Sequence, residues 1–264
     1  MGKTIRLPTM ANRKRSRLLS LLLLGAVAAF VSPPVAQASL ILIDANGNPV
    51  NTVAGSFVDL GAQGFGNAPR MLTLQTNGVE TGFVTPVDVA HGNAVPGANK
   101  STTPTLATLD WGAGNQVGIG FNSDQSGQTG ITMQSLVLTI FDGTTAVGSF
   151  SLAASLTPLT FTAADLALQQ GNGNAVFNFG LDAAEQVQFN AILAQPGSSG
   201  FFAGLSSQLG CPDNAPADCL PSNDGPDSFI GFRQPGTIPE PAALALLGAG
   251  LVGLGLIRGR RRAA

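Results

Sequence analysis

The sequence has no tyrosine, one tryptophan, one histidine and two cysteines, and only 11% of its 264 residues are charged. A single histidine excludes zinc sites of the HExxH type and any metal cage built from several histidines. The low charge does not indicate disorder, because 44% of the residues are hydrophobic and a chain of this length can bury a core. The composition therefore favours an ordered protein with few titratable groups.

The few charges are distributed unevenly along the chain. Residues 1–38 carry six Lys or Arg and no acidic residue, and residues 258–262 carry four arginines. Between these ends, residues 39–238 hold only three basic residues against twelve Asp and two Glu. Nucleic-acid phosphates are bound by cationic side chains, so the acidic middle of the chain argues against nucleic acid as a partner.

The N-terminal segment has the features of a secretory signal peptide. Its basic residues are followed by an apolar run over 18–31 and then by Ala36-Gln37-Ala38, a small-x-small cleavage site. This order predicts that residues 1–38 are a signal peptide, delivered to the export translocon and cut after Ala38. A retained membrane anchor is the alternative interpretation.

The C-terminal segment predicts a membrane helix. Residues 242–257 contain no charge, and a helix of that length spans about 24 Å, a little less than a hydrocarbon core of about 30 Å. Snorkelling arginines and local thinning of the bilayer compensate for such a deficit. The basic residues of the tail at 258–264 stop transfer and stay cytoplasmic by the positive-inside rule, which places residues 39–238 on the far side. These residues are Arg258, Arg260, Arg261 and Arg262.

Directly before this apolar helix stands the tripeptide Pro239-Glu240-Pro241. The three features in order, Pro-Glu-Pro, an apolar helix and a terminal arginine cluster, resemble the PEP-CTERM sorting signal of Gram-negative bacteria. The resemblance covers roughly the last tenth of the chain. Ile238 stands where valine is commoner in that family, and Gly259 interrupts the arginine run. An ordinary single-pass anchor with a chance Pro-Glu-Pro is the alternative.

The resemblance implies a partner and a destination. Members of this family are recognised by an exosortase, a membrane-embedded cysteine enzyme, and are transferred to the cell surface or the exopolysaccharide matrix. Pro239, Glu240 and Pro241 are then positions of a substrate rather than catalytic residues. Flanking prolines keep such a segment extended and prevent helix, which suits a processing enzyme at the membrane surface.

The middle of the chain, residues 39–232, is predicted to be one mainly β domain. Apolar residues alternate with polar ones or glycine in several stretches, which is the strand pattern, and Asn77-Gly78 and Asp142-Gly143 are typical of tight hairpins. We expect a two-sheet β-sandwich, jelly-roll-like, with a helix over about 183–194, a short helical turn in 162–170 and a linker at 233–241. The expected strands lie at 40–43, 56–60, 72–74, 79–83, 105–109, 117–121, 135–141, 149–152, 175–181, 201–209 and 228–232.

Cys211 and Cys219 are both in the exported part of the chain, eight positions apart. In an oxidising compartment an even number of cysteines at short spacing predicts a disulfide, which here closes a small loop rich in Pro and Asp. A metal site or a catalytic thiol is the alternative, but no histidine is near in the sequence.

The same region contains a candidate calcium site. Oxygen ligands suit Ca²⁺, and extracellular sites are often weak, yet Asp, Asn, Pro and Gly are also ordinary loop residues. The segment 44–48 resembles half of an EF-hand loop, but Pro49 replaces the required Gly, so it is better interpreted as a turn. The four candidate ligands are Asp213, Asp218, Asp224 and Asp227.

No catalytic motif is found. His91 is expected in a loop, and as a general base it needs partners that the sequence does not reveal. Trp111 and the phenylalanines are candidates either for a sugar-stacking platform or for the core. The sequence therefore predicts a non-enzymatic surface or matrix protein associated with exopolysaccharide. The first alternative is a carbohydrate-binding or adhesive module, either dependent on Ca²⁺ or independent of it. The second is a secreted hydrolase of unrecognised type.

Overall fold

The computed structural model of the protein describes residues 39–60, 67–125, 129–169, 175–223 and 225–235. These residues form a mainly β fold, as predicted. The strands are β1 (Ser39–Leu42), β2 (Phe57–Asp59), β3 (Arg70–Leu74), β4 (Val79–Thr85), β5 (Val89–Gly92), β6 (Val117–Asn122), β7 (Ile131–Asp142), β8 (Thr145–Leu152), β9 (Leu159–Phe161), β10 (Ala175–Leu181), β11 (Phe202–Gly210) and β12 (Asp227–Arg233).

The described strands belong to one hydrogen-bonded sheet. Its main path runs β3-β12-β6-β10-β1-β8-β7-β11-β4-β5, and β2 and β9 add to β10 and β7. The first strand, β1, pairs antiparallel with β10 on one side and parallel with β8 on the other. This four-residue strand therefore connects the half of the sheet that ends in β3 to the half that ends in β5.

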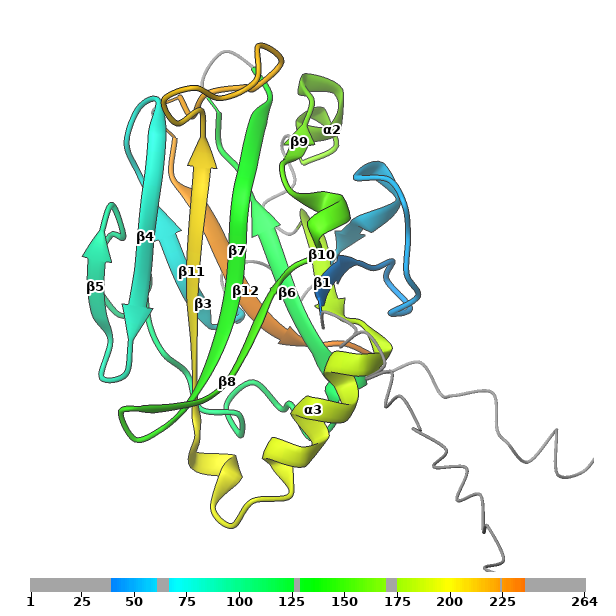
Figure 1. Ribbon diagram of the computed structural model, residues 1–264, viewed down its shortest axis with the longest axis vertical. Coiled ribbons are helices and arrows are strands. Elements are labelled where there is room, and N and C mark those ends of the chain that lie inside the picture. The colour runs from blue at the N-terminus through cyan, green and yellow to red at the C-terminus, as the bar shows by residue number, and fades with distance from the viewer. Residues whose placement is uncertain (1–38, 61–66, 126–128, 170–174, 224, 236–264) are drawn as a thin grey trace, which may run out of the picture. The chain divides into compact units, whose positions relative to one another are not determined.

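The sheet curls until its two halves face each other. β3, at one end of the path, contacts β4 and β11 near the other end, and Figure 1 shows β4, β11 and β7 in front of β3, β12 and β6. The prediction of two separate sheets is thus replaced by one continuous sheet with two facing halves. The mainly β class and the enclosed apolar core are nevertheless as expected for a sandwich.

The core is built from the inward rows that alternation predicted. Leu136, Leu138 and Ile140 of β7 are fully buried, and so are the predicted inward phenylalanines of β10. A cluster of phenylalanine rings fills one part of the interior: Phe121 lies 4.9 Å from both Phe161 and Phe229, centroid to centroid. Aromatic rings at such separations stabilise a core beyond the area that they bury.

One end of the core is closed by helix α3 (Ala183–Leu193), below the strands in Figure 1. The sequence predicted a helix over about 183–194 from the capping pattern at Asp182, and Oδ1 of Asp182 does accept a hydrogen bond from the backbone N–H of Glu185. Phe189 of α3 inserts between Trp111 and Phe150, with centroid distances of 6.2 and 5.9 Å. The short helical turn expected in 162–170 is α2 (Ala163–Ala167), which begins with a capping box at Thr162.

The two Gly-containing turns have different outcomes. Asp142-Gly143 joins β7 to β8 as a hairpin, with Gly143 at φ +57°. Gly78 also has a positive φ, +84°, but β3 and β4 on either side of it are not paired: β3 pairs with β12 and β4 with β11 and β5. The hairpin predicted at Asn77-Gly78 is therefore wrong, because the turn carries the chain from one half of the sheet to the other.

Two further sequence expectations need correction. The segment 105–109 is not a strand: it forms turns, and only Thr105 makes a bridge, to Phe202. At the C-terminal side, β12 continues to Arg233, and the backbone N–H of buried Gln234 donates to the carbonyl oxygen of Gln116 over 2.9 Å. The folded part thus extends into the segment predicted as linker, 233–241.

No helix within the described ranges is long and apolar enough to span a membrane. The membrane helix predicted at 242–257 and the basic tail at 258–264 lie outside those ranges, as does the signal peptide predicted at 1–38.

Candidate functional site

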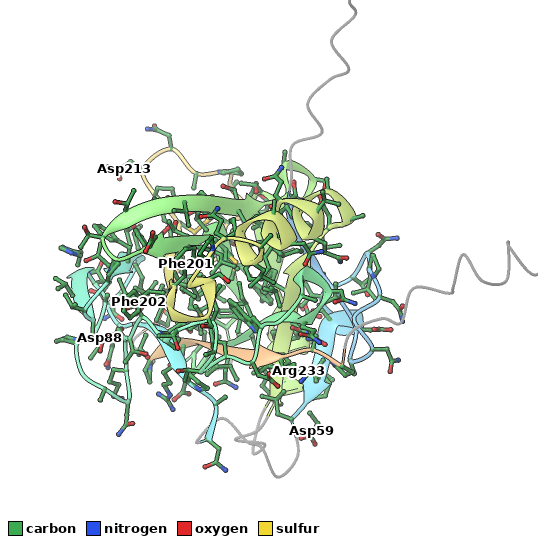
Figure 2. The ribbon with its side chains drawn as sticks, turned by 90° about the horizontal axis from the view of Figure 1, so that it is seen from below. Asp59, Asp88, Phe201, Phe202, Asp213 and Arg233 are labelled. Carbon is green, nitrogen blue, oxygen red and sulfur yellow. A yellow bond between two sulfur atoms is a disulfide. The ribbon has the colours of Figure 1, made fainter. Side chains whose placement is uncertain are left out.

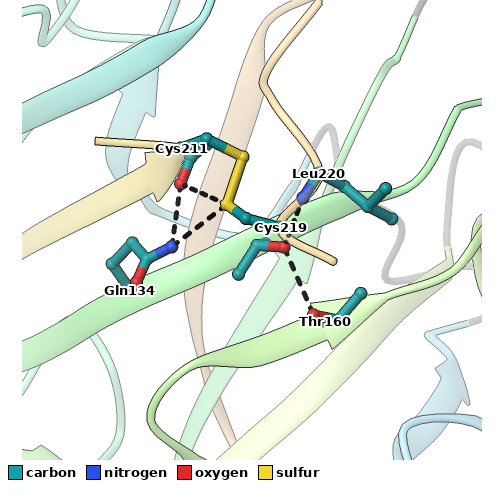
Figure 3. The surroundings of a disulfide bond; sticks show 7 residues. Gln134, Thr160, Cys211, Cys219 and Leu220 are labelled. Carbon is teal, nitrogen blue, oxygen red and sulfur yellow. Dashed lines mark hydrogen bonds between the residues drawn. A yellow bond between two sulfur atoms is a disulfide. The ribbon is translucent and has the colours of Figure 1, made fainter. Parts of the chain in front are cut away.

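A disulfide closes the loop that follows β11. Cys211 and Cys219 are bonded, with their Cα atoms 5.7 Å apart, as the sequence predicted. Gln134 of β7 supports the bridge from below: its Nε2 donates to the carbonyl oxygen of Gly210 over 3.0 Å and lies 3.4 Å from Sγ of Cys219 (Figure 3). The alternatives of a metal-binding or catalytic thiol are thereby excluded for the bonded pair.

The loop continues across the end of the sheet. The backbone of Leu220 is bound to β7 through both of its polar groups, because its N–H donates to Oγ1 of Thr132 and its carbonyl oxygen accepts from the N–H of Thr132. Ser222 then exchanges backbone hydrogen bonds with Gly78 at the start of β4. The disulfide loop is in this way fastened to both β7 and β4.

Beneath this loop the structure places two acidic side chains in the interior. Glu80 comes from β4 and Asp227 from β12, on opposite halves of the sheet, and both residues are 0% exposed. Oε1 of Glu80 accepts from the N–H of Thr76 (2.7 Å) and from Oγ of Ser222 (2.8 Å). Both carboxylate oxygens of Asp227 accept from Nε2 of Gln125, over 3.1 and 2.9 Å.

The environment of this pair favours the protonated form. Burial raises the pKa of Glu80, although its hydrogen bonds to Thr76 and Ser222 act in the opposite direction. Burial, followed by the negative charge of Glu80, raises the pKa of Asp227 well above its ordinary value. Oε2 of Glu80 is buried without a hydrogen-bond partner, which further disfavours the ionised form of this carboxyl group. Neither group is exposed to a large substrate.

Of the four aspartates predicted as a calcium site, the three that the structure describes are not brought together into one. Asp213 and Asp218 are exposed on the disulfide loop, with Asp213 at the periphery in Figure 2, whereas Asp227 is buried on β12 and bound to Gln125. Asp224 lies outside the described residues. Within the described ranges, no three His, Cys, Asp or Glu side chains are placed to hold a metal ion. Asp227 is separated from the exposed aspartates because the alternation of β12 points its side chain into the core.

Three other candidates are placed by their surroundings. Trp111 is 2% exposed and packs in the core, so it does not form a sugar-stacking platform. The segment 44–48 is a turn, as interpreted, in which Oδ1 of Asp44 accepts from the backbone N–H of Asn46 and of Asn48. His91 lies on β5 rather than in a loop, and its ring stacks on Phe83 with centroids 4.4 Å apart.

The outer face of the β7-β11-β4-β5 half carries two cross-strand pairs of aromatic side chains that the sequence analysis missed. Register places Phe141 opposite Phe202, and Phe83 opposite both Ser206 and His91, all on the side that faces away from the core. Phe83 is 42% exposed, and Val87 and Val89 nearby are 76% and 43% exposed. The alternation of β4 could have predicted this exposure. Glu80, Gly82 and Val84 point to the buried side of the strand, so Phe83 points to the opposite side. We call Phe83, His91, Phe141 and Phe202 the outer aromatic row.

The described part of the chain ends two residues after β12. Arg233, the last residue of β12, donates from Nη1 to Oδ2 of Asp110 over 2.6 Å, and Pro235 is the last residue described. A PEP-CTERM protein-sorting motif occupies residues 237–262. No curated protein and no solved structure matches this chain.

The PEP-CTERM motif suggests an exported protein that is sorted by an exosortase, and it implies processing by that membrane enzyme. It also implies C-terminal anchoring in the membrane or delivery to the cell surface. The motif contains Pro239, Glu240, Pro241 and the four arginines 258 and 260–262 that were predicted as sorting and stop-transfer residues. These positions, and Ala36 and Ala38 of the predicted signal cleavage site, lie outside the described residues.

A cavity of about 600 Å³ lies beside the last described residues. Its lining comes from Ala45, the end of β2, residues 67–69, the turn at 108–110 and residues 231–235. The acidic side chains in it are Asp59 and Asp110, and the latter is paired with Arg233; Figure 2 shows Asp59 and Arg233 at the same edge of the domain. The ion pair offsets the charge of Asp110, which leaves this cavity polar but not strongly acidic.

Proposed function

We propose that the protein is a non-enzymatic component of the cell surface or extracellular matrix of a Gram-negative bacterium. It is exported through the translocon, sorted by an exosortase through its C-terminus and retained in association with exopolysaccharide. The observation that carries this proposal is the PEP-CTERM motif at residues 237–262, which begins two residues after the last described residue of the β domain. The motif is thus adjacent to a completed fold.

Two properties of the β domain support the proposal. The disulfide between Cys211 and Cys219 suits an oxidising compartment outside the cytoplasm. The acidic middle of the chain keeps such a domain soluble and discourages binding to polyanions such as nucleic acid. Calcium remains part of the proposal only as a counter-ion for this acidic surface.

Replacement of Pro239, Glu240 and Pro241 by alanine tests the sorting role. We expect the triple variant to accumulate as an unprocessed precursor in the membrane fraction, whereas the control variant Thr144→Ala, in the exposed β7–β8 turn, is delivered normally. Mass spectrometry of the protein recovered from each fraction shows whether the C-terminal segment is present. Normal surface delivery of the triple variant contradicts the proposal.

The outer aromatic row favours a second function, binding of carbohydrate by the β domain. The apolar faces of sugar rings pack on exposed aromatic rings, and exposed apolar patches on a monomer mark interaction sites. The Phe83–His91 stack is nearly parallel, with an interplanar angle of 14°, and Phe83 and Val89 beside it are 42% and 43% exposed. A saccharide bound there would attach the domain directly to the matrix.

Binding to glycan arrays, with and without Ca²⁺, separates the two functions. A purely structural domain shows no saturable binding, whereas a carbohydrate-binding domain retains selected glycans and loses them in Phe83→Ala. Val187→Ala is the matched control, because Val187 is an exposed apolar residue (69%) on α3 and not in the outer aromatic row. Equal binding by both variants removes the outer aromatic row from the proposal.

A further inference from the structure

The first described residue of the chain is held against the start of α3. The backbone N–H of Ser39 donates to Oδ2 of Asp182 over 3.0 Å, and the N–H of Asp182 donates to the carbonyl oxygen of Ser39 over 3.2 Å. Oδ1 of the same Asp182 carboxylate accepts from the N–H of Glu185 over 2.8 Å. One carboxylate therefore connects the first residue of β1 to the first turn of α3.

Glu185, in that first turn, is an acidic side chain in an unusual environment. It is 0% exposed, and neither of its carboxylate oxygens has a hydrogen-bond partner. Burial, and next the charge of Asp182, raise the pKa of Glu185 to about 8. A buried carboxyl group that accepts no hydrogen bond is unfavourable in its ionised form. A positive charge close to Glu185 would stabilise that form.

No side chain on the neighbouring elements supplies that charge. α3 packs against β1, β8, β10 and the 3₁₀ turns at Gly114–Gln116 and Ser198–Gly200, and none of these segments contains Lys, Arg or His. On α3 and its cap, the titratable groups are Asp182 and Glu185 alone. Between residues 39 and 235 the chain has three Lys or Arg in all, and Arg233 is paired with Asp110.

We propose that Asp182 and Glu185 form a binding site for the α-ammonium group of Ser39, which is created when the signal peptide is removed. This inference rests on the export step of the proposed function. Hydrolysis of the Ala38–Ser39 amide consumes one water and yields a carboxylate on Ala38 and an ammonium on Ser39. The ammonium has three N–H donors and a positive charge. The amide that it replaces had one N–H donor and no charge.

The geometry favours this ammonium. The nitrogen of Ser39 is already within hydrogen-bond distance of Asp182, so no rearrangement of β1 is required for the contact. The partial positive charge at the N-terminus of α3 opposes a cation nearby, but the carboxylate of Asp182, which contacts the nitrogen of Ser39, carries a full negative charge and outweighs it. The new charge also favours ionisation of Glu185, whose raised pKa is then expected to fall.

The first measurement is mass spectrometry of the N-terminus of the full protein recovered from cells. Ser39 is the expected first residue, and a different first residue, or a retained N-terminal segment, overturns the proposal. The α-amine is then labelled by reductive ¹³C-methylation, which keeps its charge, and titrated by NMR. Its pKa is expected about one unit or more above the ordinary value of about 7.7–8.0, because an opposite charge lies within contact distance.

Matched variants assign this shift to the two carboxyl groups. Asp182→Asn retains an oxygen that caps α3, and Glu185→Gln retains the shape of the side chain, yet each is expected to lower the pKa of the α-amine towards the ordinary value. Asp142→Asn, in the distant β7–β8 turn, is the control and leaves it unchanged. An ordinary pKa of the α-amine in the unsubstituted protein contradicts the proposal whatever the variants show.

An insertion of Gly-Ser between Ala38 and Ser39 moves the ammonium away while Ser39 keeps its backbone N–H. We expect the inserted protein to melt a few degrees lower than the native protein at pH 7, because its ammonium no longer contacts Asp182. Equal melting temperatures at pH 7 overturn the proposal. The sorting proposal is tested separately by the alanine variant of Pro239–Pro241. That variant changes only the C-terminal segment, so we expect the pKa of the Ser39 α-amine to be the same as in the unsubstituted protein.

Discussion

Trp111 donates its indole Nε1–H to the backbone carbonyl oxygen of Phe232 over 2.9 Å, which fastens a turn in the middle of the chain to the last strand of the sheet. The ring is 2% exposed and also contacts Phe189 of α3. A side chain that the sequence allowed as a ligand platform is therefore a structural link between the turn, β12 and the helix.

Replacement of Trp111 by phenylalanine removes the indole N–H and leaves the carbonyl oxygen of Phe232 without this donor. We expect the free energy of unfolding to fall by about 1–3 kcal/mol, the cost of a buried polar group left unpaired. Trp111→Ala also removes the ring and is expected to cost about 3–5 kcal/mol. Urea unfolding followed by circular dichroism measures both, and an unchanged stability of Trp111→Phe contradicts the structural role.

The buried carboxyl pair predicts how stability depends on pH. Because the pKa values of Glu80 and Asp227 are raised in the folded protein, the folded state binds more protons than the unfolded state above about pH 4. Their contribution to stability is full below that pH and is lost as pH rises through the folded-state values. Urea unfolding between pH 4 and pH 9 is therefore expected to show a decline.

Glu80→Gln should flatten this decline. The amide keeps an oxygen for the N–H of Thr76 and the hydroxyl of Ser222 but cannot ionise, so the variant gains stability relative to the unsubstituted protein at pH 8. Asp142→Asn, which removes an exposed carboxylate, serves as the control for the change in net charge. If both variants respond alike to pH, the pair is not responsible.

Reduction of the disulfide between Cys211 and Cys219 should destabilise the β domain. Closure of so short a loop is worth about 2–3 kcal/mol by chain entropy. The melting temperature in the presence of a reductant is expected to fall, and the double variant Cys211→Ser/Cys219→Ser should melt at that lower temperature without reductant. Identical transitions in oxidised and reduced samples would refute the prediction.

Gly210 and Gly143 offer a matched test of the packing at the disulfide loop. Both have positive φ, +81° and +57°, but a Cβ on Gly210 would lie 2.0 Å from the carbonyl oxygen of Gly78, whereas a Cβ on Gly143 meets nothing within 4 Å. Gly143→Ala is expected to cost about 1 kcal/mol and Gly210→Ala about 3 kcal/mol or more. Similar losses in thermal melting would show that the close approach to Gly78 is not rigid.

Local patterns in the sequence predicted the elements that depend on nearest neighbours. Leu136, Leu138 and Ile140 alternate because one face of β7 is buried, and Asp182 begins α3 because its carboxylate satisfies a free backbone N–H of the first turn. The first two features depend on interactions between residues a few positions apart. The disulfide could be predicted because the chain has only two cysteines.

Long-range pairing was not predictable from the same signals. Asn77-Gly78 has the chemistry of a hairpin turn, and its Gly does adopt positive φ, but which strands pair is decided by the curl of the whole sheet. Glu80 and Asp227 meet only because β4 and β12 lie on facing halves. Trp111 gave no local sign of burial, since its partners Phe189 and Phe232 come from elements far along the chain.

The position of β1 sets the order in which the sheet becomes complete. A chain that crosses a membrane from its N-terminus delivers Ser39–Leu42 before the rest of the domain, yet the partners of these residues, β8 and β10, begin at residues 145 and 175. Ordering so long an intervening segment before its contacts form is slow. The strand that arrives first is therefore among the last to find its neighbours, and the hydrogen-bonded path between β8 and β10 stays open until both of these strands have emerged.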